Sequence, residues 1–165
     1  MSLHSLRTEQ KLPITIEQAW DFLSSPENLK TITPAHMGFV IKSGFRKGEK
    51  MYSGMVISYT VKPIAGIPLN WVTEITHVDE PNYFVDEQRF GPYTFWHHKH
   101  FLKEIEGGVE MSDIIHYKLP MGFIGDIGNT MFVKKQLRDI FSYRFTKLES
   151  LFGKWKAQEL LLEQD

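Results

Sequence analysis

The C-terminal part of the chain carries an apolar pattern that constrains the rest of the fold. Its residues recur at three- and four-residue steps and are Met131, Leu137, Ile140, Phe141, Leu148, Leu151, Phe152 and Trp155. After a turn at Pro120-Met121-Gly122, this period predicts one helix from roughly Asp126 to Trp155. Such a helix is about 45 Å long at 1.5 Å per residue. Because one face is apolar along this length, the helix needs a sheet of matching length to pack against.

The region before the helix has the pattern of a β-sheet. Between residues 37 and 119, runs of β-branched and aromatic residues alternate with turn-forming clusters at 44–48, 63–68, 79–82, 91–92 and 107–108. This pattern predicts an antiparallel meander of about five or six strands. Residues 3–12 predict one more strand, which gives a sheet of about six or seven strands.

Two short helices are expected directly after the first strand. Thr15 and Gln18 have the spacing of a capping box, in which each side chain bonds the other residue's backbone N–H. Pro26 suits the first position of a second helix, because proline has no N–H to leave unpaired there. The order of elements predicts an α+β fold, and we expect a single domain spanning residues 1–165.

Composition excludes several classes of function. The chain has no cysteine, so it has no thiolate nucleophile, disulfide or sulfur metal ligand. A net charge of −1 gives no electrostatic reason to expect a nucleic-acid partner. No run of about 18 apolar residues and no signal-peptide pattern is present, so we expect no integral membrane association and a soluble, cytoplasmic protein.

This order of elements resembles the helix-grip fold of the START-like (SRPBCC) superfamily, which includes the birch-pollen allergen, polyketide cyclases and dehydratases, and lipid-transfer domains. The segments "DEQRFGPYTFWHHKH", "SDIIHYKLPMG" and "IFSYR" are similar to a bacterial branch described as ligand-binding or cyclase-like. The resemblance covers nearly the whole chain. It implies a curved sheet closed by the long helix around a cavity, but no single reaction, because this fold hosts carriers, receptors and enzymes.

The segment "WHHKH" at residues 96–100 places three histidines in a predicted strand. If Gly107-Gly108 and Gly91-Pro92-Tyr93-Thr94 close the flanking hairpins, the register of three strands is fixed. That register sets His98 opposite both Tyr117 and Glu87, His100 opposite Ile115, and Arg89 opposite Trp96. The same counting can be continued through the turn at residues 79–82 into the preceding strand. It puts Val72, Glu74 and Thr76 inside instead of the more apolar Leu69, Trp71 and Ile75. We therefore expect an irregularity in that preceding strand.

The register divides the side chains between two faces. One face collects Val85, Glu87, Arg89, Trp96, His98, His100, Leu102, Asp113, Ile115, Tyr117 and Leu119. The other collects Phe84, Asp86, Gln88, Phe90, Phe95, His97, Lys99, Phe101, Lys103, Ser112, His116 and Lys118. Because lysines are almost never buried without a partner, the second face is assigned to solvent and the first to the interior.

The candidate ligand-binding residues follow from this assignment. The polar end of the cavity comprises Glu87, His98, His100, Asp113 and Tyr117, and the other candidates are Arg89, Met55 and the wall residues Trp71 and Trp96. We expect the partner to be a small hydrophobic or amphipathic molecule, because such cavities combine an apolar wall with a few polar groups.

Several alternatives remain open for the polar residues. They can form a self-satisfied network that fixes strand register. Separately, the domain can be a non-catalytic interaction module whose cavity is vestigial. A histidine beside carboxylates and a tyrosine also suits acid-base catalysis by a cyclase, dehydratase or isomerase on a ketide-like substrate. His98 and His100 with Glu87 or Asp113 have ligand types that zinc or iron accepts. Because histidine-x-histidine alone is a weak pattern, we expect no metal and no cofactor; the oligomeric state is left open.

Overall fold

A computed structural model describes residues 3–64, 66–120 and 126–165, with the backbone alone at 63, 64 and 126–130. The chain runs through β1 (His4–Leu12), α1 (Ile16–Leu23), the 3-10 helices η1 (Pro26–Lys30) and η2 (Ala35–Met37), β2 (Val40–Ser43), β3 (Val56–Ile64), β4 (Ile67–Asp79), β5 (Tyr83–Phe90), β6 (Phe95–Ile105), β7 (Gly108–Lys118), α2 (Asp126–Phe152) and β8 (Leu161–Gln164). The predicted turn before the long helix lies partly outside the described residues, because 121–125 are not among them.

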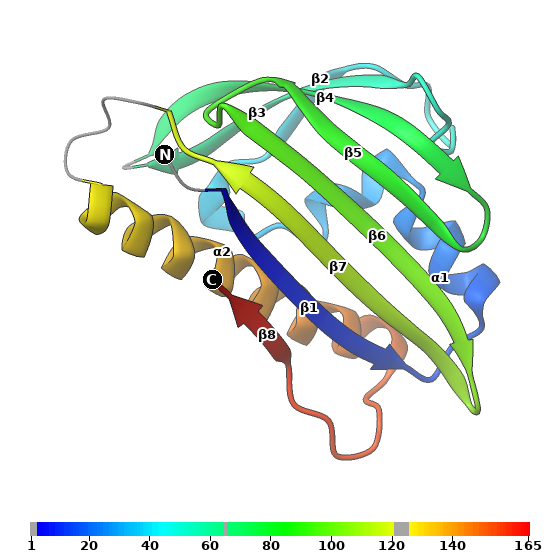
Figure 1. The fold of residues 1–165 in the computed structure, drawn as a ribbon. Coiled ribbons are helices and arrows are strands. Elements are labelled where there is room, and N and C mark those ends of the chain that lie inside the picture. The colour runs from blue at the N-terminus through cyan, green and yellow to red at the C-terminus, as the bar shows by residue number, and fades with distance from the viewer. Residues whose placement is uncertain (1–2, 65, 121–125) are drawn as a thin grey trace.

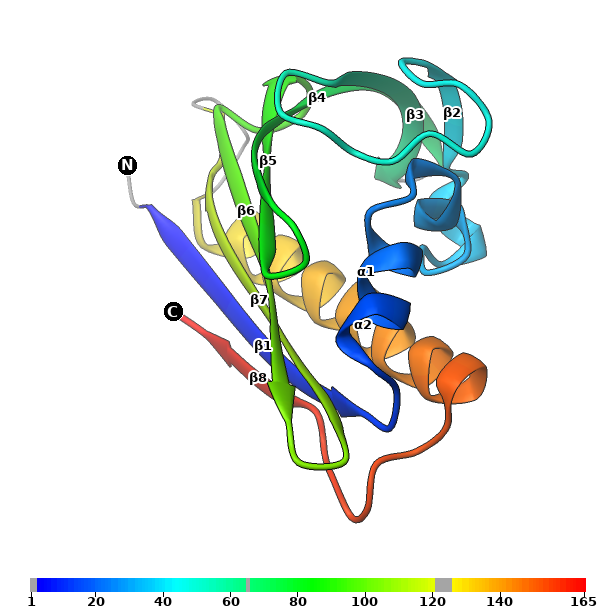
Figure 2. The same ribbon diagram turned by 90° about the vertical axis from the view of Figure 1, so that its right-hand side faces the viewer.

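All the described strands join one antiparallel sheet in the order β2-β3-β4-β5-β6-β7-β1-β8. The sheet is strongly curved, and its concave side wraps around α2 and the short helices (Figures 1 and 2). This is the predicted helix-grip α+β fold, with eight strands instead of six or seven. No helix in the described part of the chain is long and apolar enough to cross a membrane.

The additional strand is β8, which follows the long helix and pairs with β1, so that Leu6 lies opposite Gln164. It was missed because a four-residue strand carries too little alternation to be recognised. The helix itself ends three residues earlier than predicted. Gly153 stops it with a φ of 97°, a backbone conformation that glycine adopts readily after a helix, and its N–H bonds the carbonyl of Glu149 at 2.9 Å.

The buried face of α2 differs from the predicted apolar stripe. The inward residues are Val133, Leu137, Phe141, Arg144 and Leu148. They keep the three- and four-residue steps, but an arginine takes one inward position. Met131 and Leu151 were expected inside and are 67% and 44% exposed. That part of the prediction is wrong, because apolar side chains at both ends of the stripe stand on the rim of the buried face.

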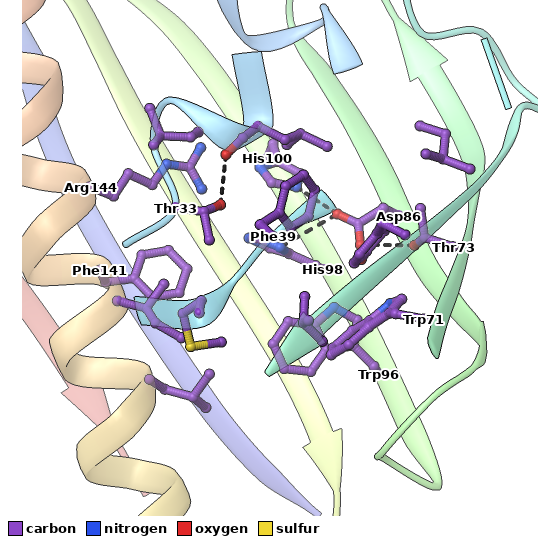
Figure 3. Close-up of a pocket in the computed structure, with 18 of the residues that line it drawn as sticks. Thr33, Phe39, Trp71, Thr73, Asp86, Trp96, His98, His100, Phe141 and Arg144 are labelled. Carbon is purple, nitrogen blue, oxygen red and sulfur yellow. Dashed lines mark hydrogen bonds and ion pairs between the residues drawn. The ribbon is translucent and has the colours of Figure 1, made fainter. Parts of the chain in front are cut away.

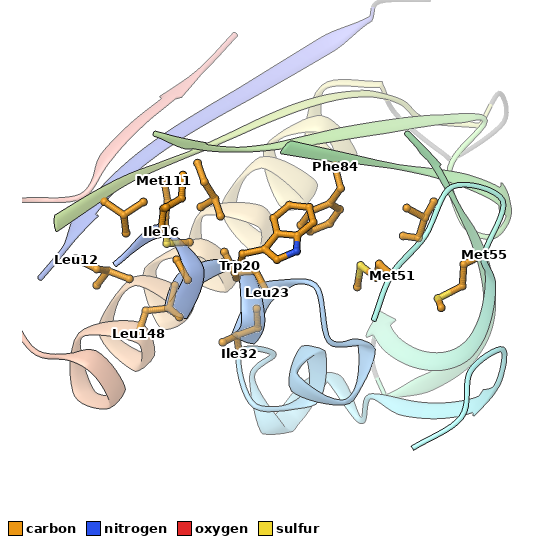
Figure 4. Close-up of a cluster of buried hydrophobic side chains, with 14 of the residues drawn as sticks. Leu12, Ile16, Trp20, Leu23, Ile32, Met51, Met55, Phe84, Met111 and Leu148 are labelled. Carbon is orange, nitrogen blue, oxygen red and sulfur yellow. The ribbon is translucent and has the colours of Figure 1, made fainter. Parts of the chain in front are cut away.

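The capping box is confirmed at the start of α1. The Gln18 N–H donates to Thr15 Oγ1 at 3.3 Å, and the Thr15 N–H donates to Gln18 Oε1 at 3.0 Å. The helix then packs Trp20 and Leu23 into the larger apolar core, together with Leu148 of α2 (Figure 4). The second short helix begins at Pro26 as predicted, with 3-10 geometry.

The register of β6 and β7 corrects the predicted pairs but keeps the faces. The turn occupies Glu106 and Gly107, so every pair shifts by two residues, and His98 lies opposite Ile115 while His100 lies opposite Asp113. Because side chains alternate with period two, a shift of two residues leaves each on the same face. The predicted inward orientation of both histidines is therefore confirmed.

The observed register between β5 and β6 places each side chain of β5 on the opposite face from the one predicted. Asp86 lies opposite His98, where Glu87 was expected. This odd shift puts Asp86 inside and turns Glu87 and Arg89 to the outer face, where they form an ion pair at 3.3 Å. The loop between the strands is longer than assumed, since Gln88 Nε2 bonds the Tyr93 carbonyl at 2.6 Å and Thr94 bonds the Lys118 carbonyl instead of β5.

The expected irregularity in β4 is present. The register between β4 and β5 shifts between Val72 and Thr73 and again between Ile75 and His77. Trp71, Thr73 and Ile75 are buried on the concave side, where simple counting had placed Val72 and Glu74. The reversed face of β5 explains this, because Ile75 lies opposite the inward Asp86.

Candidate functional site

A cavity of about 180 Å³ lies between the concave face of the sheet and the long helix (Figure 3). Strands β3 to β6 provide one wall, the segment from Leu29 to Phe39 provides a second, and α2 provides a third through Leu137, Ile140 and Phe141. The lining is mainly apolar, and charged groups are confined to one part of it. This combination is typical of sites that take small organic molecules.

Aromatic rings from three strands and one loop form a continuous wall. Tyr59 stacks on Trp71 with ring centres 5.8 Å apart, and Trp96 meets Trp71 edge to face at 5.2 Å. Tyr93 contacts both tryptophans, with ring centres at 5.5 and 4.8 Å. Burial raises the pKa of both Tyr59 and Tyr93, so both phenols stay neutral at ordinary pH. The wall is therefore aromatic, uncharged and suited to an apolar ligand.

Beside this wall, two histidines are held between two aspartates. His98 Nε2 lies 2.9 Å from Asp113 Oδ1, and His100 Nε2 lies 2.7 Å from Asp86 Oδ2. The remaining nitrogens approach the other carboxylate, with His98 Nδ1 at 3.4 Å from Asp86 and His100 Nδ1 at 2.9 Å from Asp113. The imidazole rings stand 3.7 Å apart. We call Asp86, His98, His100 and Asp113 the polar cluster.

Arg144 connects the polar cluster to the long helix. Its Nη1 lies 3.3 Å from Asp113 Oδ1, and Thr8 Oγ1 lies 3.4 Å from Oδ2 of the same carboxylate. On the other side, Thr73 Oγ1 lies 3.4 Å from Asp86 Oδ1. The arginine, both histidines and Asp113 are buried. Removing charges from water is costly unless they are paired, so the mutual pairing of these groups explains how the interior holds them.

Both carboxylates remain ionised. Burial alone would raise the pKa of Asp113, but Arg144 and the two imidazoles outweigh it and hold that pKa well below its usual range. The pKa of Asp86 is lowered as well, because the two histidines outweigh its burial. An ionised carboxylate only accepts hydrogen bonds, so His98 Nε2 donates to Asp113 and His100 Nε2 donates to Asp86.

The two imidazoles shift in opposite directions. Burial and the neighbouring His100 lower the pKa of His98. Burial also disfavours charge on His100, but the adjacent carboxylates of Asp113 and Asp86 outweigh that effect and raise its pKa. These opposite shifts favour positive charge on His100 over His98, so His100 and Arg144 are the groups best placed to balance the two carboxylates.

Two buried donors at the cavity have no hydrogen-bond partner among the described residues: Trp71 Nε1 and Arg144 Nε. Both groups can only donate. His100 Nδ1 also lacks a hydrogen bond of good geometry, although it lies close to Asp113. An unpaired buried donor costs about 1 to 3 kcal/mol. Acceptor oxygens on a ligand are the chemical complement of such donors.

The sequence-predicted residues fall into three groups. Trp71, Trp96, His98 and His100 line the cavity. Three further residues do not border the cavity. Asp113 contacts both histidines, and Met55 lies in the larger core. Tyr117 belongs to a second, smaller apolar core, against which Tyr93 packs. Glu87 and Arg89 are on the outer face, as described above.

Two residues of the site were missed by sequence reasoning, Asp86 and Arg144. Asp86 was assigned to solvent by the register error. Arg144 interrupts an apolar stripe at an inward position, and that interruption was the available signal. Asp86, His98 and His100 are also the residues whose ligand atoms could hold a metal ion, since these atoms all lie within 4.8 Å of one another.

Comparisons with known proteins identify the fold. No protein-family model and no curated protein matches the chain. Among solved structures, the chain is similar to protein Ms6760 from Mycobacterium smegmatis, with a TM-score of 0.63, 15% identity and 89% of each chain covered. It is also similar to CV1439 from Chromobacterium violaceum, with a TM-score of 0.65, 13% identity, and 92% of this chain and 99% of that one covered.

A third similar structure is Ara h 8.0201, a Bet v 1-like allergen. Its TM-score is 0.58 at 16% identity, with 90% of this chain and 99% of that chain covered. Identities this low concern the arrangement of the backbone and not the chemistry of a site. With the curved sheet and the C-terminal helix, these likenesses show that the chain has the START-like helix-grip fold.

Proposed function

We propose that the protein binds a small, mainly apolar organic molecule in the cavity, with an oxygen-bearing head group directed to the polar cluster. The observation that carries the proposal is a cavity in which an aromatic wall meets buried, unpaired donors on Trp71 and Arg144. Solved structures of Bet v 1-like type support a ligand-binding cavity in this fold. A cytoplasmic location, a single domain over residues 1–165 and the absence of a nucleic-acid partner stay predictions.

The volume limits the size of the ligand. An apolar cavity of about 150 Å³ accommodates benzene. The cavity here is about 180 Å³, which suits one aromatic ring with a small substituent. Single-ring phenols and benzoates combine that size with acceptor oxygens, and we take them as the probe class.

A cavity-filling substitution tests the proposal. Ile140 of α2 borders the cavity, so Ile140→Trp should place an indole in the ligand's space. A ligand at 100 times its Kd adds about 2.7 kcal/mol to the free energy of unfolding. We expect the best phenol or benzoate to raise the Tm of the wild type by several degrees and to leave the Tm of Ile140→Trp unchanged.

The control is Tyr143→Trp, which adds an indole to the same helix at an exposed position away from the cavity. It should keep the wild-type thermal shift. If no probe raises the wild-type Tm, or if Ile140→Trp responds as strongly as Tyr143→Trp, the cavity is not the binding site.

Acid-base catalysis is the second candidate function, and the orientation of His98 favours it. Asp113 accepts the Nε2 proton of His98, so the Nδ1 lone pair lies on the side of Asp86 and the cavity. A carboxylate that orients a neutral imidazole is an arrangement used for general bases. A cyclase, dehydratase or isomerase of this type would lose turnover in His98→Ala, whereas His97→Ala, on the outer face of the same strand, would keep it.

A further inference from the structure

We propose that Asp86, His98 and His100 form a binding site for one divalent transition-metal ion on the cavity wall. This goes beyond the proposed ligand binding and does not depend on it. The three residues come from adjacent strands, with Asp86 on β5 and both histidines on β6, and all three border the cavity (Figure 3). Two imidazoles and one carboxylate are a ligand set that Zn²⁺ and Fe²⁺ accept.

The position of Asp113 is the first argument. This carboxylate lies 2.9 Å from Nε2 of His98 and 2.9 Å from Nδ1 of His100. Metal-bound histidines usually donate their second N–H to a carboxylate or carbonyl, which fixes the ring and its tautomer. Asp113 accepts this hydrogen bond from His98 and lies equally near Nδ1 of His100, although the latter contact lacks good hydrogen-bond geometry. The nitrogens left over are His98 Nδ1 and His100 Nε2, and both lie on the side of Asp86.

The contact between His98 and Asp86 is the second argument. His98 donates its Nε2–H in a hydrogen bond to Asp113, so its Nδ1 presents a lone pair to Asp86 Oδ2 at 3.4 Å. Two acceptors at this distance do not stabilise one another unless a cation bridges them. Donor atoms bound to one zinc at about 2.0 to 2.2 Å stand roughly 3.3 to 3.6 Å apart in a tetrahedron. The His98–Asp86 pair already has that separation.

The contact between His100 and Asp86 shows what the ion would replace. His100 Nε2 lies 2.7 Å from Asp86 Oδ2, joined by a proton. A metal ion would take the place of that proton, and the ring would withdraw by roughly 0.6 to 0.9 Å to reach ligand spacing. Arg144 would still balance Asp113. The ion would add positive charge beside Asp86, and its open positions would face the cavity, where an oxygen ligand can bind.

Metal binding also separates this proposal from the catalytic alternative. An ion bound at His98 Nδ1 occupies the lone pair that a general base needs. The same residue therefore acts either as a ligand or as a base.

The test uses the tag-free protein of 165 residues after a chelator has removed any bound metal. This protein is titrated with Co²⁺ alone, and binding is monitored by visible absorption. We expect one Co²⁺ per chain with the intense bands of a site of low coordination number. Asp86→Asn, His98→Gln and His100→Gln should each weaken binding at least about 100-fold. His97→Gln and His116→Gln are matched controls, because these histidines face each other on the outer side of β6 and β7 and should be dispensable.

A measurement on the wild type keeps the test valid if a variant does not fold. With Zn²⁺ bound, long-range ¹H–¹⁵N correlations of the imidazoles should show His98 bound through Nδ1 and His100 through Nε2. The proposal is overturned if the wild type binds no Co²⁺, if all three inner variants that fold bind it as the wild type does, or if binding is lost in the His97 or His116 variant instead. Because the titration contains no organic ligand, its failure leaves the proposed function untouched.

Discussion

Replacing Asp113 by alanine should lower the free energy of unfolding by about 3 to 5 kcal/mol, the range found when one partner of a buried ion pair is removed. The carboxylate faces Arg144, His98 and His100 at 3.3, 2.9 and 2.9 Å. The histidines can lose their protons when it is removed, but the arginine cannot. Asp113→Ala therefore leaves a buried guanidinium without its counter-ion. Urea unfolding followed by circular dichroism measures the change.

The matched control is Asp139→Ala on the exposed side of α2. Asp139 pairs with Lys135 at 2.7 Å, a shorter distance than the Asp113–Arg144 contact, but both side chains are more than half exposed. Exposed pairs contribute about 0 to 1 kcal/mol. A loss below about 1 kcal/mol in both variants would mean that removing Asp113 leaves no buried, uncompensated charge, and our description of the polar cluster would be wrong.

Replacing Leu148 by alanine should destabilise the protein by about 2 to 5 kcal/mol, the usual range for a leucine removed from a packed core. Leu148 is 1% exposed and lies in the larger core with Trp20 and Leu23 of α1. Its loss would leave a void where α2 packs onto α1 and the sheet. Equilibrium unfolding in urea measures the effect.

Leu151→Ala provides the control, one turn further along the same helix. Leu151 is 44% exposed, so the substitution should change stability by less than about 1 kcal/mol. The two variants also compare two descriptions of the helix, since the sequence pattern places both leucines on the buried stripe. Equal losses would favour the sequence pattern over the observed burial.

The fold could be predicted from the sequence because its signals are long and redundant. Almost 30 residues of helical period, a capping box at Thr15 and five turn clusters all point to the same order of elements. The strand β8 could not be predicted, because four residues are too few to show the alternation of a strand.

The candidate site was predicted in part, and the limit was the register. The inward orientation of His98 and His100 was predicted correctly although the turn at Gly107 was misplaced. The resulting register error was two residues, which leaves each side chain on the same face. The predicted inward orientation of Glu87 was wrong, because the loop at Gly91 is longer than assumed. That loop shifts the register by one residue and places Asp86 where Glu87 was expected. Loop conformation depends on hydrogen bonds such as that from Gln88 to the Tyr93 carbonyl, and no local sequence pattern predicts such a bond.

Arg144 shows a different limit. An arginine on a helix is exposed by default. Its burial follows from Asp113, which lies 31 positions earlier in the chain and on the facing strand. Neither residue predicts the other without the packing of α2 on the sheet. The same packing distance decides the volume of the cavity, so the size of the ligand also had to come from the structure.

The central claim is that a small molecule binds inside this cavity, and methyl NMR tests it most directly. Met37 and Met51 border the cavity, whereas Met55 is buried in the core away from it and Met131 is exposed on α2. With ¹³C-methyl methionine and the best phenol or benzoate, the account predicts shifts at Met37 and Met51 while Met55 and Met131 stay in place. Shifts confined to Met131, or no shift at saturating probe, would contradict it.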